Sequence, residues 1–465
     1  MKKHIIYFLL SFVLSVGIWT RFEYMLVLSA ITTSLLLFSS TCGSINDNIS
    51  KILKNKFNWI LLAITLIVIV SLCNPNGIFI QEDGYYYIKK IPYIEYLPTS
   101  ISIFPSERGS YYFILFLLNI FNITNTYILT TKTKQDINLF FIYISIFGFI
   151  CANTIILMTI YNSHNAVETS GRKLLGIIEA YMASPTGTFF SQNMASQYMI
   201  LILSATISLF IQNLKEVKTA HNSTYIIVFG IFIIFDIIAL VLCIQLQAFI
   251  GIVVLTLTLI AEVFHIILKQ RRNFIYLLSV IIALGTVTYI FIPNNQLVET
   301  LSTQISNKLE RKITETHQDK GRIALWCHAY NLFEKNKYWG IGVNNFYFYS
   351  YQYDKEYYIK QHPQKVSKSI SYSAHNDLLQ LLCEFGIFGS TIFFVGMVYF
   401  LILLSKRITS QYPYKNTLVG ILLVAIISLF DMPFQLINVS CLFILYSTSI
   451  LLYYSIDTCP RNHLP

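Results

Sequence analysis

Charged side chains are scarce in this chain. Of its 465 residues only 12% are Asp, Glu, Lys or Arg, whereas 55% are hydrophobic. Soluble domains carry about 25% charged residues, so the composition argues against an ordinary soluble enzyme. Such a long chain, poor in charge and rich in apolar runs, is typical of a polytopic membrane protein. We therefore predict an all-α membrane protein.

The chain also lacks motifs that would carry chemistry on their own. Its eight cysteines are scattered with no CxxC pair, which indicates neither a disulfide framework nor a zinc site. No Gly-x-Gly-x-x-Gly is present, so the segment Gly340-Ile341-Gly342 is interpreted as a tight turn rather than a nucleotide loop. An Asp-x-Asp motif, an internal repeat and a low-complexity tract are also missing. Any chemistry must lie in the polar segments between the apolar runs.

Long apolar runs recur along the chain, and a helix needs about 20 such residues to cross a bilayer. Twelve runs qualify, and we predict about 12 transmembrane helices. They lie near 5–20, 24–40, 57–73, 110–130, 137–161, 192–211, 224–242, 247–268, 274–292, 385–404, 416–431 and 434–455. The whole chain, 1–465, is expected to form a single membrane domain.

The placement of Lys and Arg predicts the orientation. With the N-terminus inside, sixteen of these residues fall in cytoplasmic segments and six in the outer loops before residue 293. Short cytoplasmic loops carry this excess in membrane proteins. Both termini are therefore predicted to be cytoplasmic. The net charge of +10 is explained by this placement and does not call for a nucleic acid partner.

Three sizeable segments would then lie on the outer face, at 74–109, 162–191 and 293–374. The last, between predicted helices 9 and 10, holds eleven Lys and Arg against seven Asp and Glu. Loops longer than about 60 residues escape the charge rule, so this basic excess is free to hold an anion or simply to aid solubility. We expect the chemistry in the region 321–389, where water meets lipid.

Arg322 opens a short predicted amphipathic helix, and Trp326 lies four residues on, on the same side. The planar guanidinium forms two parallel bonds to a phosphate, so an Arg packed on an aromatic ring at the membrane surface suits a lipid phosphate. The alternative is an Arg that reaches lipid headgroups without a catalytic role.

His375 precedes Asn376 and Asp377 at the predicted start of a helix that enters the membrane. A histidine titrates near neutral pH and is suited to accept a proton from a substrate at the interface. Glu384, nine residues on, is expected on roughly the same face. Alternatively, Asn376 or Asp377 caps the helix, and His375 is merely solvated.

A second polar cluster contains Gln192 and Asn193 before the sixth helix, with Arg172 upstream in the same outer segment. Their amides are suited to sugar hydroxyls or to a helix cap. Asp236 is placed deep in the seventh helix, where a single carboxylate is expected to bond a neighbouring helix.

Several segments together resemble the O-antigen ligase and O-antigen polymerase superfamily. The segments that carry this resemblance are Leu97-Pro98-Thr99-Ser100, Gly187-Thr188-Phe189 with Gln192-Asn193-Met194-Ala195, Arg322 with Trp326, Gly340-Ile341-Gly342, His375-Asn376 with Leu379, Glu384, Gly386 and Gly389, and Asp431-Met432-Pro433-Phe434.

The resemblance implies a GT-C-type membrane glycosyltransferase of the bacterial inner membrane. Its donor would be an undecaprenyl-diphosphate-linked glycan, passed en bloc at the periplasmic face to a lipid A core sugar, another glycan or a protein hydroxyl. No nucleotide sugar, cofactor or metal is implied. His375 would be the catalytic base and Arg322 the diphosphate ligand, with Arg172, Asn193, Asn376, Glu384 and Trp326 as substrate-binding candidates.

One position departs from the family pattern. Members often carry an Arg just before the helix equivalent to number eight, where this chain has Gln247. Arg172, Lys173 or a lysine of the large loop would then hold the diphosphate. Ligase, polymerase and protein oligosaccharyltransferase remain open. So do two other classes, a lipid-linked sugar flippase and a non-catalytic assembly subunit.

Overall fold

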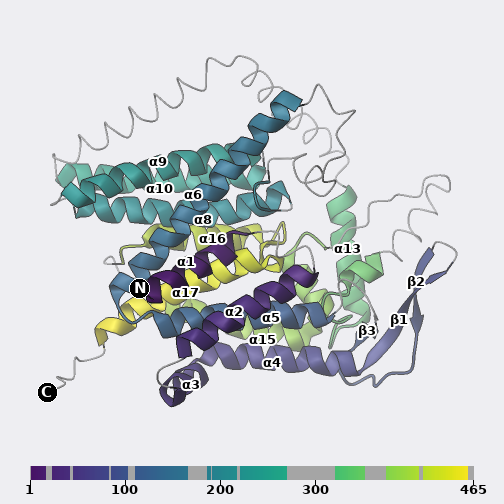
Figure 1. Ribbon diagram of the computed structural model, residues 1–465. Coiled ribbons are helices and arrows are strands. Elements are labelled where there is room, and N and C mark those ends of the chain that lie inside the picture. The colour runs from purple at the N-terminus through teal and green to yellow at the C-terminus, as the bar shows by residue number, and fades with distance from the viewer. Residues whose placement is uncertain are drawn as a thin grey trace.

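The computed structural model describes residues 2–16, 23–41, 45–82, 85–102, 110–165, 186–189, 191–216, 220–243, 245–269, 320–350, 373–407 and 412–458. Most of them are helical (Figure 1). The helices are α1 (Lys2–Ser15), α2 (Glu23–Thr41), α3 (Ile45–Lys54), α4 (Lys56–Cys73), α5 (Ser110–Thr130), α6 (Lys134–Asn165), α8 (Gln192–Lys215), α9 (Ala220–Cys243), α10 (Leu246–Lys269), α13 (Lys320–Lys335), α15 (Asp377–Arg407), α16 (Lys415–Ile427), the short 3₁₀ helix η3 (Pro433–Gln435) and α17 (Ile437–Thr458).

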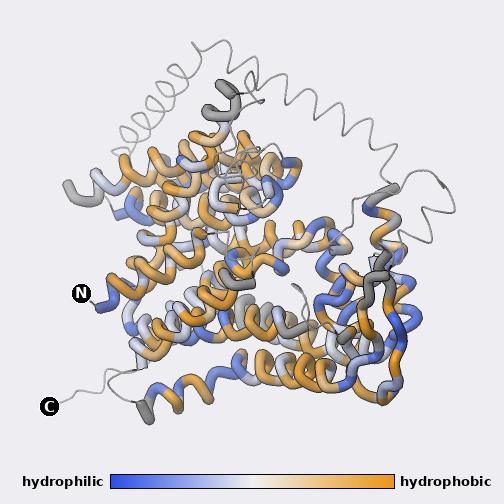
Figure 2. The backbone as a smooth tube through the Cα atoms, turned by 45° about the vertical axis from the view of Figure 1, so that its right-hand side comes forward, coloured by the Kyte–Doolittle hydropathy of each residue, from blue (hydrophilic) through white to orange (hydrophobic). Residues whose placement is uncertain are grey.

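Eleven of the twelve apolar runs overlap these helices, and the run 274–292 lies outside the described residues. Within the described ranges, eight helices are long and apolar enough to cross a membrane. Two more apolar helices, Leu26–Thr41 and Lys415–Ile427, are shorter. The chain is thus a mostly helical polytopic membrane protein, and the count of twelve spans stays a prediction. Figure 2 shows that the hydrophobic residues follow the helical stretches.

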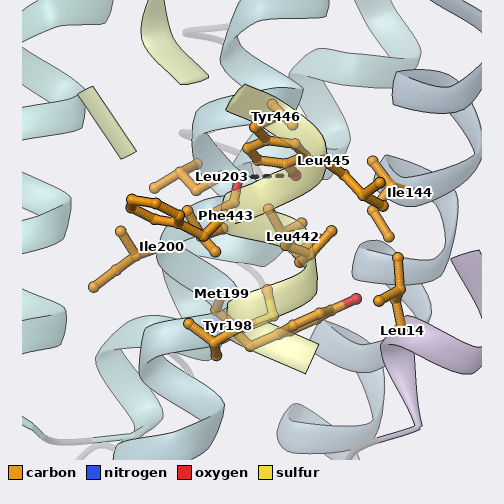
Figure 3. Packing of buried hydrophobic residues seen from close by; sticks show 14 of the residues in the cluster. Leu14, Ile144, Tyr198, Met199, Ile200, Leu203, Leu442, Phe443, Leu445 and Tyr446 are labelled. Carbon is orange, nitrogen blue, oxygen red and sulfur yellow. Dashed lines mark hydrogen bonds between the residues drawn. The ribbon is translucent and has the colours of Figure 1, made fainter. Parts of the chain in front are cut away.

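Helix α8 lies at the centre of the bundle. Eighteen of its residues between Ala195 and Leu214 are buried. Glycines of three neighbouring helices let them approach α8 closely, because a Cβ on Gly148, Gly251 or Gly420 would collide with an α8 side chain. Helix α17 packs its Leu442 and Tyr446 against the same helix, and the Tyr446 hydroxyl donates to the Leu201 carbonyl (Figure 3). The position of α8 is therefore tightly fixed.

A small sheet departs from the all-α prediction. Strands β1 (Pro75–Glu82) and β2 (Tyr85–Lys90) form an antiparallel hairpin, and β3 (Ser100–Ser102) pairs parallel to β1. These residues lie in the predicted outer segment 74–109. Ile and Tyr are enriched there, and such side chains favour a pleated, half-buried surface. The strands are too short and too polar to be apolar helical runs.

The sheet and α13 pack together at one end of the bundle (Figure 1). The Trp339 indole donates to the Tyr96 carbonyl at 3.0 Å, and the Phe79 and Phe348 rings lie 4.9 Å apart. The described parts of the predicted outer segments 74–109 and 293–374 are therefore neighbours.

The start of α1 and the end of α17 lie at the opposite end of the bundle (Figure 1). There Lys3 pairs with Asp136 at 2.7 Å, and Lys134 lies over the Tyr453 ring.

Helix α15 is broken at Gly386, whose φ of 62° and ψ of −168° are not helical. The turn after α13 pairs with the break. Ile341 N–H donates to the Cys383 carbonyl, and Ile387 N–H donates to the Lys337 carbonyl. Gly340 also has positive φ, and a Cβ there would collide with the Glu384 backbone. The turn prediction for residues 340–342 is confirmed, and its glycines allow two backbones to touch.

Candidate functional site

The segment 373–376 leads into α15 and presents His375. His375 and Asn344 are the two non-glycine residues with positive φ in the described part of the chain, and His375 has φ of 50°. Asn376 caps α15, because its Oδ1 accepts from Leu379 N–H at 2.9 Å. Its Nδ2 donates to the Leu429 carbonyl at 2.8 Å. Asn376 thus ties the start of α15 to the turn that follows α16.

That turn carries Asp431, which sequence reasoning did not place in the site. His375 Nδ1 donates to Asp431 Oδ1 at 3.2 Å. The Asp431 side chain is 5% exposed and the His375 side chain is 27% exposed. A second donor, Gln197 Nε2 of α8, reaches Asp431 Oδ2 at 3.2 Å. The buried carboxylate therefore holds the imidazole at Nδ1, and the His375 side chain is the more exposed of the two.

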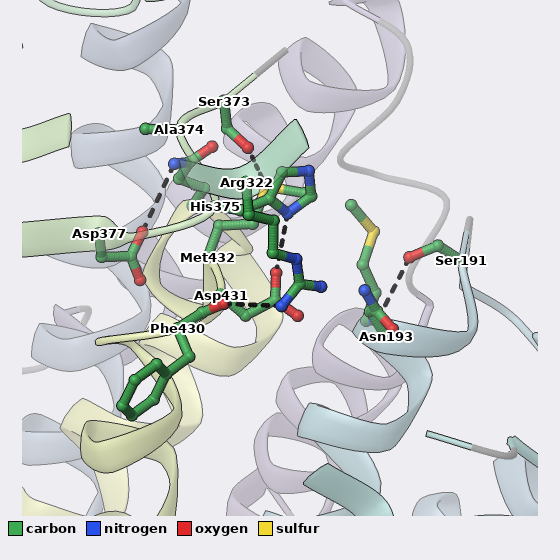
Figure 4. Close-up of polar contacts among 12 residues, drawn as sticks. Ser191, Asn193, Arg322, Ser373, Ala374, His375, Asp377, Phe430, Asp431 and Met432 are labelled. Atoms are coloured by element: carbon green, nitrogen blue, oxygen red, sulfur yellow. Dashed lines mark hydrogen bonds and ion pairs between the residues drawn. The ribbon is translucent and has the colours of Figure 1, made fainter. Parts of the chain in front are cut away.

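Arg322 comes from α13 to the same turn. Its Nη1 donates to the carbonyl of Phe430, the residue before Asp431, at 3.2 Å. Figure 4 shows the guanidinium beside the Asp431 and His375 pair. Arg322, from within the predicted loop 293–374, and His375, directly after it, are thus brought to the same turn.

The expected stacking of Arg322 on Trp326 does not occur. Both residues are described and no cation–π contact joins them. Trp326 is half-buried, and within the described ranges its indole nitrogen is buried without a hydrogen-bond partner. The guanidinium turns toward the Phe430 carbonyl instead. A substrate-binding role of Trp326 stays a prediction.

The first turn of α8 borders the site. Ser191 caps this helix by accepting from Met194 N–H at 3.3 Å. The Asn193 carbonyl accepts from Gln247 Nε2 at 3.1 Å. Figure 4 places the Asn193 side chain across from Arg322 and His375. Arg172, the other candidate from this outer segment, lies outside the described residues.

Glu384 faces away from His375. Its carboxylate accepts from the backbone N–H groups of Asn344, at 2.8 Å, and Phe346, at 3.2 Å. Gln380 donates to it as well. The predicted common face is wrong, because nine residues are about two and a half helical turns and so end on the opposite side; the carboxylate is directed into the turn after α13. Asp236 is not part of this cluster. Its carboxylate accepts a hydrogen bond from Thr206 of the neighbouring α8 at 3.1 Å, as expected for a single buried carboxylate.

Two members of this cluster, Asp431 and Gln197, were not among the sequence candidates. Asp431 belongs to one of the segments that carry the family resemblance. It also lies in a short turn between two apolar helices, where a carboxylate is unusual. Gln197 follows Asn193 by four residues, so helical spacing places it on the same side of α8. Both signals were present, but neither showed which residue the side chain would meet.

A histidine held by a buried carboxylate can act as a general base. Because an ionised carboxylate only accepts, the proton of the neutral imidazole lies on Nδ1 and Nε2 carries the lone pair. No hydrogen bond to Nε2 occurs within the described part of the chain. The adjacent guanidinium can bind an anion. The class defined by this fold and site is a helical membrane protein that places a carboxylate-bonded histidine and an arginine at one end of the bundle.

Comparison with protein families agrees with this class. Residues 231–394 match the family model described as O-antigen ligase. This match confirms the predicted resemblance to the O-antigen ligase superfamily, and it covers Gln247, Arg322 and His375. The family is a polysaccharide-related, glycosyltransferase-like class of membrane proteins. No curated protein matches the chain.

Proposed function

We propose that the protein transfers a glycan en bloc from a polyprenyl diphosphate, such as undecaprenyl diphosphate, to an acceptor hydroxyl at the periplasmic face of the inner membrane. The observation that carries the proposal is the contact of His375 with the buried Asp431, with Arg322 bonded to the adjoining carbonyl. One base and one cation, held by the same turn, are the two groups that this displacement needs.

The proposed reaction is a single displacement. The acceptor hydroxyl oxygen attacks the anomeric carbon of the donor, and its proton passes to His375 Nε2. The bond from the anomeric carbon to the diphosphate oxygen breaks, and its electron pair leaves with the diphosphate. Asp431 stabilises the resulting imidazolium, as the carboxylate of a catalytic triad does. Arg322 stabilises the charge that builds on the leaving diphosphate.

The experiment is a transfer assay with the purified protein in nanodiscs. Undecaprenyl-diphosphate-linked glycan is supplied as donor, with lipid A core sugar, a free glycan or a serine-containing peptide as acceptor. We expect acceptor-dependent release of undecaprenyl diphosphate, and the productive acceptor distinguishes ligase, polymerase and protein oligosaccharyltransferase. Movement of intact donor across vesicle membranes, without release of undecaprenyl diphosphate, would favour the flippase alternative and overturn the proposal.

A further inference from the structure

A chain of side-chain amides extends behind the His375 and Asp431 pair. Gln247 of α10 donates from Nε2 to Ser196 Oγ at 2.8 Å and to the Asn193 carbonyl at 3.1 Å. Gln197 Nε2 reaches Gln247 Oε1 at 3.5 Å and Asp431 Oδ2 at 3.2 Å. We call Gln247, Gln197 and Asp431 the amide relay. It connects α10 through α8 to the imidazole.

The direction of each bond in the amide relay is fixed by partners that can only accept. The Asn193 carbonyl accepts, so the Gln247 amide nitrogen faces it and its Oε1 faces Gln197. The Asp431 carboxylate also accepts, so the Gln197 nitrogen faces it. Both N–H groups of Gln197 are thereby used, and Asp431 Oδ1 is left to accept from His375 Nδ1–H. The amide relay therefore favours the tautomer of His375 that carries its proton on Nδ1.

Gln197 carries a cost that packing does not explain. The residue is 1% exposed, and within the described ranges its Oε1 is buried without a hydrogen-bond partner. An unpaired buried acceptor lowers stability, and Gln197 keeps one while its Nε2 donates to Gln247 and Asp431. A buried polar group that lowers stability is expected where function needs it.

We infer that Gln197 is a positioning residue, which holds Asp431 in the orientation that keeps His375 Nε2 free as the base. This inference rests on the proposed function. The inference also gives Gln247 a role. At the position where family members often carry an Arg, Gln247 supports the base through Gln197 and does not bind the diphosphate.

The charged groups near His375 limit what can set its protonation. They are Asp431 on the turn, Arg322 from α13 and Asp377 two residues along, whose carboxylate accepts from Phe434 N–H. The described residues that α8 and α10 contribute at this level are neutral, namely Asn193, Ser196, Gln197 and Gln247. Loss of the Gln197 donor would concentrate the Asp431 charge on its contact with the imidazole.

The test variant is Gln197→Met, which removes the amide but keeps a similar volume. We expect kcat to fall about tenfold, since one hydrogen bond to a charged group is lost, with KM nearly unchanged. The acid limb of the kcat profile should move to higher pH. Gln247→Ala should act in the same direction by a smaller factor.

Gln212→Met is the matched control. Gln212 lies on the same helix, and its Oε1 is likewise buried without a partner in the described part of the chain. It is far from the site along α8, so kcat and its pH profile should stay unchanged. An unshifted profile in Gln197→Met would overturn the inference.

A second measurement does not depend on transfer activity. Diethyl pyrocarbonate modifies the neutral imidazole, and mass spectrometry of the His375 peptide follows its rate. In Gln197→Met the rise of this rate with pH should be displaced to higher pH relative to the wild type and Gln212→Met. If no donor is turned over by the wild type, the proposed function fails, but this displacement still tests the amide relay. Superimposed modification profiles would contradict the relay.

Discussion

His375 has a conformation that few residue types tolerate. A positive φ is uncommon outside glycine, with Asn, Asp and His enriched, and such conformations cluster where function compensates for the strain. Here the contacts of Asn376 and Asp431 hold the backbone and the ring. Asn is therefore the best replacement for removing the imidazole while keeping the backbone.

We predict that His375→Asn lowers transfer by about 10²–10⁴-fold, the range for loss of a general base, and that the protein is still expressed and inserted. The assay is release of undecaprenyl diphosphate in nanodiscs. His265→Ala, which removes an exposed histidine of α10, should keep full activity. Near wild-type turnover in His375→Asn would exclude His375 as the base.

Arg322→Lys is predicted to lower transfer by about 10²-fold, because Lys keeps the charge but loses the planar fork that binds two phosphate oxygens. The double variant with His375→Asn should be hardly worse than the worse single variant if both act in one transition state. Multiplicative losses, measured in the same assay, would mean that the two residues act in separate steps.

The site was predictable only in part. His375 and Arg322 stand out because each lies at the start of a predicted helix in the polar region 321–389. Asp431 lies 56 residues from His375 and meets it only through the packing of α15 on the turn after α16. The helical repeat already directs Glu384 away from His375, since nine residues are about two and a half turns, but its partners could not be inferred. A break at Gly386 lets the turn after α13 approach, and its backbone N–H groups draw the carboxylate toward them.

At the scale of elements, the break in α15 should be intolerant of a side chain. Gly386→Ala would place a Cβ against the Tyr338 carbonyl and the Gly340 nitrogen, in a backbone region open only to glycine. We predict a loss of about 2 kcal/mol or more in unfolding free energy, seen as a lower melting temperature in detergent.

Gly396→Ala is the control for this prediction on the same helix. The nearest atom to its Cβ is the end of the Ile60 side chain at 3.3 Å, and Ala favours helix. Its melting temperature should equal or exceed that of the wild type. Equal melting temperatures for Gly386→Ala and the wild type would contradict the strain argument.

Helix α13 should loosen in acid. Burial lowers the pKa of His328 from 6.5 to about 4, against a raising hydrogen bond with the Tyr349 backbone. Unfolded α13 therefore binds the proton more readily than the folded helix. Its stability is fully present above pH 6.5 and is lost as pH falls through about 4, by about 3 kcal/mol at most. Hydrogen exchange of α13 amides at pH 7 and pH 5 measures this, and His328→Leu should remove the difference.

Helices were predictable from apolar runs because a bilayer demands a minimum length of continuous apolar surface. The sheet at 75–102 was not predictable in this way. Its strands are short, and the pairing between strands has no local sequence signal as strong as an apolar run. The start of α15 was predictable as well, because Asn376 and Asp377 were expected at the beginning of a helix and Asn376 does cap it. Its first turns, from Asp377, belong to the site, and the apolar run begins only near Phe385.

For the whole molecule, the arrangement predicts the topology. The sheet and α13 lie at one end of the bundle, and the start of α1 and the end of α17 lie at the other (Figure 1). Cysteines introduced at the exposed positions Lys337 and Tyr96 should react with an impermeant maleimide in intact cells. Those at Lys54 and Ser455 should react only after permeabilisation, in a background with the natural cysteines replaced. The reverse pattern would place the site in the cytoplasm.

The interruption at Gly386 also bears on how the protein responds to its lipid. A transmembrane rod adjusts to a thicker or thinner bilayer by tilting, and an unbroken α15 would swing His375 with it. Because the first turns of α15 are tied to the turns after α13 and α16 by backbone bonds, the rod beyond Gly386 can change its angle while the histidine stays in register with Arg322. Transfer rates should therefore vary little between nanodiscs made from short-chain and long-chain lipids.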